Sequence, residues 1–389
     1  MNRILVLNNV SKKGLALFGD AHRVGQDTTD PEGIIVRSAK VNTDQYPHLV
    51  AVARAGAGVN NVSVARATEK GVCVFNTPGA NANAVAELVF IMLGNFARHV
   101  DEALRFVRSL DGDDLSITDR VEAEKSTFAG FELVGKTLGV IGLGKIGVLV
   151  ANAGIKRSMR VIGHDAFPTF GNMHQLDSRV EVVRKMEGLL SEADVLSVHV
   201  PLSEKTKHLI GVSQVNSMKD EVILMNYARE GIYDDAAVID GLRVGKVRAF
   251  ITDFPTRALL EEKGVICTPH LGASTAESEE NCAVMAAKQL KNYLEYGVVT
   301  NSVNFPTIET FPAQGIRARL AIVNKDMPGM IAVIAGMLGD AGINIQALTN
   351  ESAGGIGYNL VDLGIDVGDE LVSKISAAPN ILRVRVLRF

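Results

Sequence analysis

Three polar residues follow apolar runs in the second half of the sequence, and their types suit one kind of reaction. Arg229 comes after "VILMNYA", Asp253 after "AFIT" and His270 after "GVICTP". An arginine can grip a carboxylate through two parallel hydrogen bonds, and a histidine can accept a proton near neutral pH. A carboxylate beside the histidine would orient the imidazole and stabilise its charged form. The set predicts hydride removal from a small hydroxy acid, provided that a nicotinamide cofactor binds nearby.

A glycine-rich turn supplies the site that such a cofactor needs. The segment "TLGVIGLGKIG" is an apolar strand followed by G-x-G-x-x-G at the start of a helical pattern. Gly142 would allow the tight turn, Gly144 the close approach of a pyrophosphate, and Gly147 close packing of the helix on the strand. The next strand, "RVIGHD", ends in Asp165. Its carboxylate could accept both ribose hydroxyls of NAD and would repel the 2′-phosphate of NADP, so we expect NAD.

The elements that must position these residues are parallel strands. Residues 1 to 97 alternate short β-branched runs with helical stretches, and a second such series begins near residue 137. Strands that alternate with helices indicate parallel sheets covered on both faces, with ligands at the carboxyl ends of the strands. In "SVHVPL", His199 and Pro201 stand at one such end. We interpret His199 as a packed histidine that lines the adenosine side.

The end of the chain has a different pattern. The segment from "RARLAIVN" to "NILRVRVL" alternates as β-α-β-β-α-β, which predicts a ferredoxin-like module. We therefore predict an α/β protein with two flavodoxin- or Rossmann-like parallel-sheet domains and a C-terminal ferredoxin-like α+β domain. We predict a substrate-binding domain at residues 1–97, completed by 280–305, and an NAD-binding domain at 98–279. A linker at 306–315 and the C-terminal module at 316–389 follow.

Composition excludes several other classes of protein. The chain has 389 residues, 47% of them hydrophobic, with a net charge of −4 and three cysteines. No basic patch predicts a nucleic-acid partner, no apolar run is long enough to cross a membrane, and no ligand cluster predicts a metal. The short apolar core of "MNRILVLNN" does not fit a signal peptide, and three widely spaced cysteines fit reduced thiols. We expect a cytoplasmic protein with a small-molecule substrate.

Seven segments make the sequence resemble the D-isomer-specific 2-hydroxyacid dehydrogenases over essentially its whole length. In order they are "RAGAGVNNV", "NTPGANANAVAEL", "GKTLGVIGLGKIG", "HVPL", "NYAREG", "TPHLGAST" and "NSVNFP". The resemblance implies that Arg229 anchors the substrate carboxylate and that His270 is the acid/base. The NAD contacts that it implies are Lys145, Ile146, Asp165, Tyr227, Ala228, Asp253, Gly272 and Ala273. For a phosphorylated substrate it implies Arg37, Ser38, Arg54, Gly56 and Asn81.

The sequence departs from the family pattern at two places. Glu230 follows Arg229 where the family has glycine, so a carboxylate stands beside the substrate-binding arginine. The segment that carries the partner of the family's catalytic histidine is shortened here to "DFPTRALLEE", with Arg257 and Ala258 where the glutamate should be. Three candidates for that partner stay open, with Asp253 favoured: Asp253, Glu261 and Glu262.

The resemblance also extends to the C-terminal module, which is similar to the ACT domain, a small effector-binding module. By position, the residues that would bind L-serine are Asn324, Asp326 and Asn344. A plain dimerisation domain is the compatible alternative, because such sheets pair edge to edge. We expect a homodimer or a homotetramer.

The function that the resemblance implies is NAD-dependent oxidation of 3-phosphoglycerate to 3-phosphohydroxypyruvate, which opens serine synthesis. One alternative is a reductase of glyoxylate, hydroxypyruvate or another 2-oxo acid. The other is an NAD-sensing binding protein on the same fold, to which the missing glutamate would point.

Overall fold

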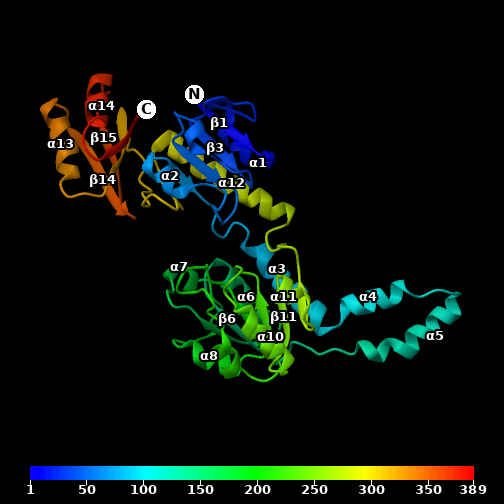
Figure 1. Cartoon of the computed structure of the whole chain (residues 1–389). Coiled ribbons are helices and arrows are strands. Elements are labelled where there is room, and N and C mark those ends of the chain that lie inside the picture. Colours follow the sequence, from blue (N-terminus) through cyan, green and yellow to red (C-terminus); the bar gives the residue numbers. More distant parts are fainter. The chain divides into compact units, whose positions relative to one another are not determined.

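The computed structural model describes residues 1–389, which form two compact units (Figure 1). One consists of Met1–Asn81 with Ala276–Phe389, and the other of Ala82–Thr275. The change at residue 82 lies before the predicted boundary at 97/98. The reason is that α3 (Ala82–Ala97) buries Val89 and Leu93 in the same core as Leu138 of the second unit.

The first unit contains a five-stranded parallel sheet in the order β2-β1-β3-β4-β5. This is the doubly wound order of flavodoxin-like folds, as predicted. The helix α12 (Ala276–Tyr296) returns to this unit and buries Cys282, Ala286 and Leu290 in its core. The remaining elements are β1 (Asn2–Leu7), α1 (Lys12–Leu15), β2 (His22–Gly25), β3 (Gly33–Val36), β4 (Ala51–Arg54), α2 (Val64–Glu69) and β5 (Cys73–Phe75).

The second unit contains a seven-stranded parallel sheet in the order β12-β11-β10-β9-β6-β7-β8. The strand order reverses between β6 and β9, as in the Rossmann fold, and this switch point is where such sheets bind ligands. The strands are β6 (Thr137–Ile141), β7 (Arg160–His164), β8 (Glu181–Val182), β9 (Val195–Val198), β10 (Val222–Asn226), β11 (Val247–Thr252) and β12 (Val265–Cys267). The helices around them include α6 (Lys145–Lys156), α7 (Phe170–Met173), α8 (Met186–Glu192), α9 (Val212–Ser217), α10 (Asp235–Arg243) and α11 (Arg257–Leu260).

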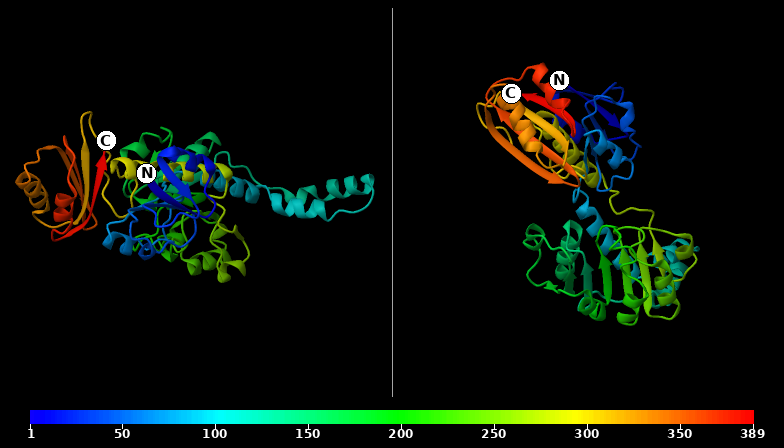
Figure 2. Two further views of the ribbon diagram at one scale, coloured as in Figure 1. Left: turned by 90° about the horizontal axis from the view of Figure 1, so that it is seen from above. Right: turned by 60° about the vertical axis from the view of Figure 1, so that its left-hand side comes forward.

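An arm of two helices extends from this unit (Figure 1; Figure 2, left). The helices are α4 (Val100–Arg108) and α5 (Asp114–Glu124). Neither helix has a buried residue. The side chains of Leu104, Val107 and Leu115 are exposed although they are apolar. The arm therefore carries apolar surface that its own unit does not cover.

The C-terminal module is a four-stranded antiparallel sheet in the order β14-β15-β13-β16, with two helices on one face. Its elements are β13 (Ala318–Lys325), α13 (Met330–Asp340), β14 (Ile345–Ala353), β15 (Ile356–Leu363), α14 (Asp369–Ser376) and β16 (Ile381–Arg388). The order of elements and strands confirms the ferredoxin-like arrangement. The predicted linker is itself packed, because Ile308 is buried and pairs with Val299 through two main-chain hydrogen bonds.

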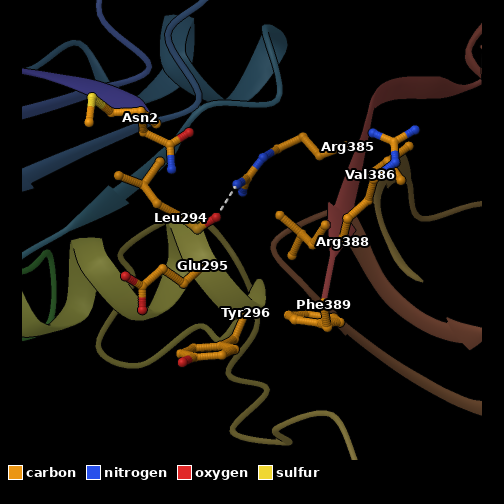
Figure 3. Close-up of a pocket in the computed structure, with 10 residues that line it drawn as sticks. Asn2, Leu294, Glu295, Tyr296, Arg385, Val386, Arg388 and Phe389 are labelled. Carbon is orange, nitrogen blue, oxygen red and sulfur yellow. Dashed lines mark hydrogen bonds between the residues drawn. The ribbon is translucent and has the colours of Figure 1, made fainter. Parts of the chain in front are cut away.

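The other face of this sheet packs against α12 and the core of the five-stranded sheet. Arg319 donates to the carbonyl of Tyr296 at 2.9 Å, and Arg385 donates to that of Leu294 at 3.0 Å. Figure 3 shows the Arg385 contact beside a pocket of ≈ 650 Å³. Tyr296 and Phe389, whose rings stack on each other, are among the residues that line this pocket. These contacts make the C-terminal module part of the first unit.

Candidate active site

The glycine turn between β6 and α6 has a different constraint at each glycine. Gly142 has φ = 90°, and a Cβ there would lie 2.6 Å from the carbonyl oxygen of His199. A Cβ on Gly147 would lie 1.8 Å from the carbonyl oxygen of Gly142. Gly144 has no neighbour within 4 Å of such a Cβ, and no side chain caps α6, which begins after it. Open space beside uncapped N–H groups fits the pyrophosphate of a dinucleotide.

Asp165 follows β7 and fixes the glycine turn. One carboxylate oxygen accepts from the main-chain N–H of Leu143 at 2.7 Å, and the other from that of Phe167 at 2.8 Å. A carboxylate oxygen has two lone pairs, so each still has one to offer to a ligand hydroxyl. The residue can therefore hold the turn and accept from a ribose at the same time.

His199 follows β9, next to β6 in the sheet. Its Nε2 lies 2.8 Å from the hydroxyl of Ser197, while its Nδ1 is buried without a hydrogen-bond partner. Burial lowers the pKa of this imidazole to about 4, so it is neutral at physiological pH. Pro201 is exposed two residues later. The buried Nδ1 supports the interpretation of His199 as a packed side chain at the switch point, and its place on the adenosine side stays a prediction, as does the role of Pro201.

Arg229 is exposed on a turn after β10 that Asn226 shapes. The amide of Asn226 donates to the carbonyl of Arg229 at 3.0 Å and accepts from the N–H of Ala228 at 3.2 Å. The guanidinium donates to the carbonyl of Ala228 at 2.7 Å and forms no ion pair with Glu230. The charge of Arg229 is therefore not neutralised by the carboxylate that follows it.

Tyr227 stands just before this turn and is buried. Burial raises the pKa of its hydroxyl, which stays protonated. Its hydroxyl can therefore act only as a neutral hydrogen-bonding group.

His270 lies on the loop after β12, and Asp253 holds that loop. The carboxylate of Asp253 accepts from the Thr268 hydroxyl at 2.6 Å and from the N–H groups of Leu271 and Gly272 at 2.8 and 2.7 Å. The imidazole of His270 is exposed, packs against the Phe254 ring in a T-shaped arrangement, and has no hydrogen bond to this carboxylate. Asp253 therefore positions the backbone that carries His270 rather than the ring itself.

The two glutamates proposed as alternative partners are engaged elsewhere. Glu261 pairs with Arg257 at 2.7 Å, and Glu262 pairs with Arg243. Neither has a contact with His270 in this structure. None of the three carboxylates predicted as candidate partners therefore contacts the imidazole of His270.

Because all strands of the second sheet are parallel, the residues that follow them meet at one edge. This edge brings together most of the residues predicted for NAD binding and catalysis. They are Gly142, Gly144, Asp165, His199, Tyr227, Ala228, Arg229, Asp253, His270, Gly272 and Ala273.

In the first unit, the predicted substrate residues follow β3 and β4. Arg54 donates from Nε to the carbonyl of Arg37 at 3.0 Å, so the two arginines are adjacent. The loop at Ser38 is held by Asn8, whose amide oxygen accepts from the N–H of Ser38 at 3.0 Å. Gly56 follows Arg54 with φ = 157°, and a Cβ there would lie 2.9 Å from a guanidinium nitrogen of Arg54.

Asn81 is the last residue before the second unit. Its position in the chain places it beside the glycine-containing turn at Gly79, which has φ = 83°.

Two residues of this region were not predicted. Glu279 of α12 forms an ion pair with Arg37 at 2.6 Å, and Asn8 follows β1. Asn8 could have been found by applying the strand-end rule to β1. Glu279 gave no such signal, because its helix is distant in sequence from Arg37.

The three predicted effector residues have different environments. Asn324 is buried, and its amide oxygen accepts from the side chain of Asn359 at 2.7 Å. Asp326 accepts from the hydroxyl of Ser352 at 3.1 Å, and Asn344 is exposed just before β14. Asn324 thus uses its amide oxygen on Asn359 and its amide nitrogen on the carbonyl of Lys325, whereas Asn344 is open to a ligand.

A parallel-sheet unit with a glycine turn at its switch point defines a dinucleotide-binding protein of the doubly wound class. Residues 90–272 match the model of the D-isomer specific 2-hydroxyacid dehydrogenase, NAD binding domain. The chain belongs to the D-isomer-specific 2-hydroxyacid dehydrogenase family. The prediction of NAD as the cofactor is confirmed at the level of this domain.

Two curated relatives match this chain over different shares of their own length. D-3-phosphoglycerate dehydrogenase of Methanocaldococcus jannaschii is 35% identical over 315 residues, which are 78% of this chain and 58% of that protein. Hydroxypyruvate reductase of Thermotoga maritima is 38% identical over 278 residues, which are 68% of this chain and 85% of that protein. The chain thus spans less than two thirds of the first relative and most of the second.

A solved structure agrees with the fold. The NAD+-bound 3-phosphoglycerate dehydrogenase of Entamoeba histolytica has a TM-score of 0.61 against this chain, with 26% sequence identity. The match covers 78% of this chain and 98% of that protein. No helix of the chain has both the length and the apolar character that spanning a membrane requires.

Proposed function

We propose that the protein oxidises 3-phosphoglycerate to 3-phosphohydroxypyruvate with NAD. The observation that carries this proposal is the pair of adjacent arginines, Arg37 and Arg54, at the carboxyl ends of β3 and β4. Two guanidinium groups suit a dianionic phosphate better than an uncharged substituent. The relative from Methanocaldococcus jannaschii supports the same substrate class.

Arg229 would hold the substrate carboxylate. Its guanidinium uses one donor on the carbonyl of Ala228 and has no acidic partner, so two parallel donors stay available. Held in this way, the substrate would present its C2 hydrogen to the cofactor.

His270 would take the hydroxyl proton on a ring nitrogen. As the C2–H bond breaks, the hydride with its electron pair leaves the substrate, and the C2–O bond becomes a carbonyl. NAD supplies the hydride acceptor when it is bound. The loop held by Asp253 keeps His270 in place, with the N–H of His270 donating to the carbonyl of Asp253 at 3.2 Å.

Two other functions are each favoured by one observation. The relative from Thermotoga maritima favours a reductase of unphosphorylated 2-oxo acids. The absence of a carboxylate contact on His270 favours a binding protein that senses NAD.

We also propose a homo-oligomer that responds to L-serine. The exposed apolar residues Leu104, Val107 and Leu115 of the arm support self-association, and the open position of Asn344 supports an effector site. A homodimer or homotetramer and a cytoplasmic location stay predictions.

The experiment that separates these functions is a substrate comparison with purified protein. We expect NAD-dependent turnover of 3-phosphoglycerate with a higher kcat/KM than turnover of glyoxylate or hydroxypyruvate in the reverse direction. A preference for the unphosphorylated acids would favour the reductase. NAD binding without turnover of any of them would favour the sensor.

A further inference from the structure

We propose that Glu279 competes with the phosphate of the substrate for Arg37 and thereby limits how tightly phosphorylated ligands bind. The inference rests on the proposed function, because it assumes that Arg37 contacts the phosphate. It adds a residue that sets the affinity of the site and that is not among the predicted substrate ligands.

The two arginines of this site are anchored differently. Arg54 donates to the main-chain carbonyls of Arg37 and Gly58, so protein atoms fix its guanidinium. The guanidinium of Arg37 pairs with a single side chain, the carboxylate of Glu279, at 2.6 Å. The position of the Arg37 guanidinium therefore depends on this carboxylate.

The first turn of α12 places Glu279 against Arg37. Cys282 lies one turn further along this helix and is buried. Burial raises the pKa of its thiol, and the nearby positive charges of Arg54 and Arg37 oppose that shift. Both guanidinium groups thus lie close to the part of α12 that carries Glu279.

The ion pair is open to water and therefore exchangeable. The side chains of Arg37 and Glu279 are 42% and 44% exposed. A pair this exposed changes an equilibrium constant by at most about fivefold, so an anion of higher charge can displace the carboxylate.

Glu279 can affect a bound phosphate dianion in two ways, and both weaken the binding of the phosphate. If the carboxylate leaves Arg37, the ion pair is lost. If it stays, a negative charge lies beside the phosphate. A substrate without a phosphate meets neither effect, so Glu279 acts selectively on phosphorylated ligands.

The test compares Glu279→Gln with Glu280→Gln. Glutamine keeps the shape and one acceptor oxygen but removes the charge. Glu280 is the matched control, because it neighbours Glu279 on α12 and pairs with Lys13 at 2.7 Å, whereas Glu279 pairs with Arg37. We expect Glu279→Gln to lower the KM for 3-phosphoglycerate by about three- to fivefold. D-Glycerate kinetics and the Glu280→Gln variant should be unchanged, and an equal or higher KM would overturn the proposal.

A binding measurement keeps the test independent of turnover. Inorganic phosphate should bind Glu279→Gln more tightly than the unaltered protein, by the same factor, in a calorimetric titration. In an Arg37→Gln background, the Glu279→Gln change should have a smaller effect, because the competition for Arg37 is gone and only charge repulsion is left. An equal gain without Arg37, or no gain in the unaltered background, would overturn the inference. Absence of turnover with tighter phosphate binding would instead reject the proposed function alone.

Discussion

In the glycine turn, Gly147 is needed for folding and Gly144 for the approach of a ligand. A methyl group on Gly147 would collide with the Gly142 carbonyl, whereas one on Gly144 would enter open space. The first change disturbs the packing of α6 on β6, and the second disturbs only what approaches the helix from outside.

We therefore predict opposite outcomes for two alanine variants. Gly144→Ala should keep the thermal stability of the protein and weaken NAD binding by about tenfold, or roughly 1.4 kcal/mol. Gly147→Ala should lower the melting temperature. Differential scanning fluorimetry with and without NAD measures both. Unchanged NAD affinity in a folded Gly144→Ala protein would show that the dinucleotide does not approach this turn.

His199 gives a prediction on pH. Burial lowers the pKa of its imidazole to about 4 in the folded state, from 6.5 for the free side chain. As the pH falls below 6.5, the unfolded chain binds a proton that the folded chain excludes, so stability is lost towards pH 4. Between pH 7 and pH 5 the loss from this residue amounts to about 2 kcal/mol.

The matched variant is His199→Gln, which cannot take up the proton. Its urea unfolding curves should shift less between pH 7 and pH 5 than those of the unaltered protein. Equal shifts in the two proteins would mean that the imidazole is not excluded from protonation in the folded state.

At the scale of elements, the loop after β12 depends on Asp253. Its carboxylate accepts one hydroxyl and two main-chain N–H groups of residues 268–272. This network explains how a loop with His270 at φ = 56° is held in a strained conformation.

Replacing Asp253 by asparagine should therefore change the position of His270 and not the pH at which activity is lost. An amide has only one acceptor oxygen, so at least one loop contact is lost, and a displaced His270 should lower kcat by about a hundredfold. The acidic limb of the pH–rate profile should keep its midpoint, because the carboxylate does not touch the imidazole.

Glu261→Gln and Glu262→Gln are the controls for this experiment, since both carboxylates pair with arginines. Their profiles should coincide with that of the unaltered protein. A midpoint that moves to lower pH in any of the three variants would identify that residue as a partner that forms with bound ligands.

The sequence predicted elements better than contacts. The alternation of apolar runs was enough for both parallel sheets and the C-terminal module, because burial on one or two faces gives each element its period. The alternation could not show which carboxylate contacts His270. Asp253 lies at the expected strand end, but its carboxylate binds the loop backbone instead of the imidazole. Nothing in the sequence indicated the ion pair between Glu279 and Arg37, because these two residues are far apart in the chain.

At the scale of the whole molecule, a buried ion pair stabilises the C-terminal module where it meets α12. Arg319 and Asp362 are almost completely buried and share two hydrogen bonds, one of 2.8 Å. Arg319 also donates to the carbonyls of Tyr296 and Thr310 at 2.9 and 2.8 Å. One side chain thus links the module to the end of α12 and to the segment after it.

Asp362→Ala would leave this guanidinium buried without its counter-charge, so we expect a loss of about 3–5 kcal/mol in unfolding free energy. The exposed pair of Arg388 and Asp366, at 2.9 Å in the same module, provides the control. Asp366→Ala should cost no more than about 1 kcal/mol. Urea unfolding followed by circular dichroism measures both, and equal losses would contradict a structural role for the buried pair.

The most direct test of the account is NADH formation from 3-phosphoglycerate and NAD by the unaltered protein and by His270→Asn. We predict substrate-dependent NADH formation that falls by about two to four orders of magnitude in the variant, the usual contribution of a positioned base. The affinity for NAD should be nearly the same in both proteins. No NADH from 3-phosphoglycerate, or an equal rate in the variant, would contradict the account.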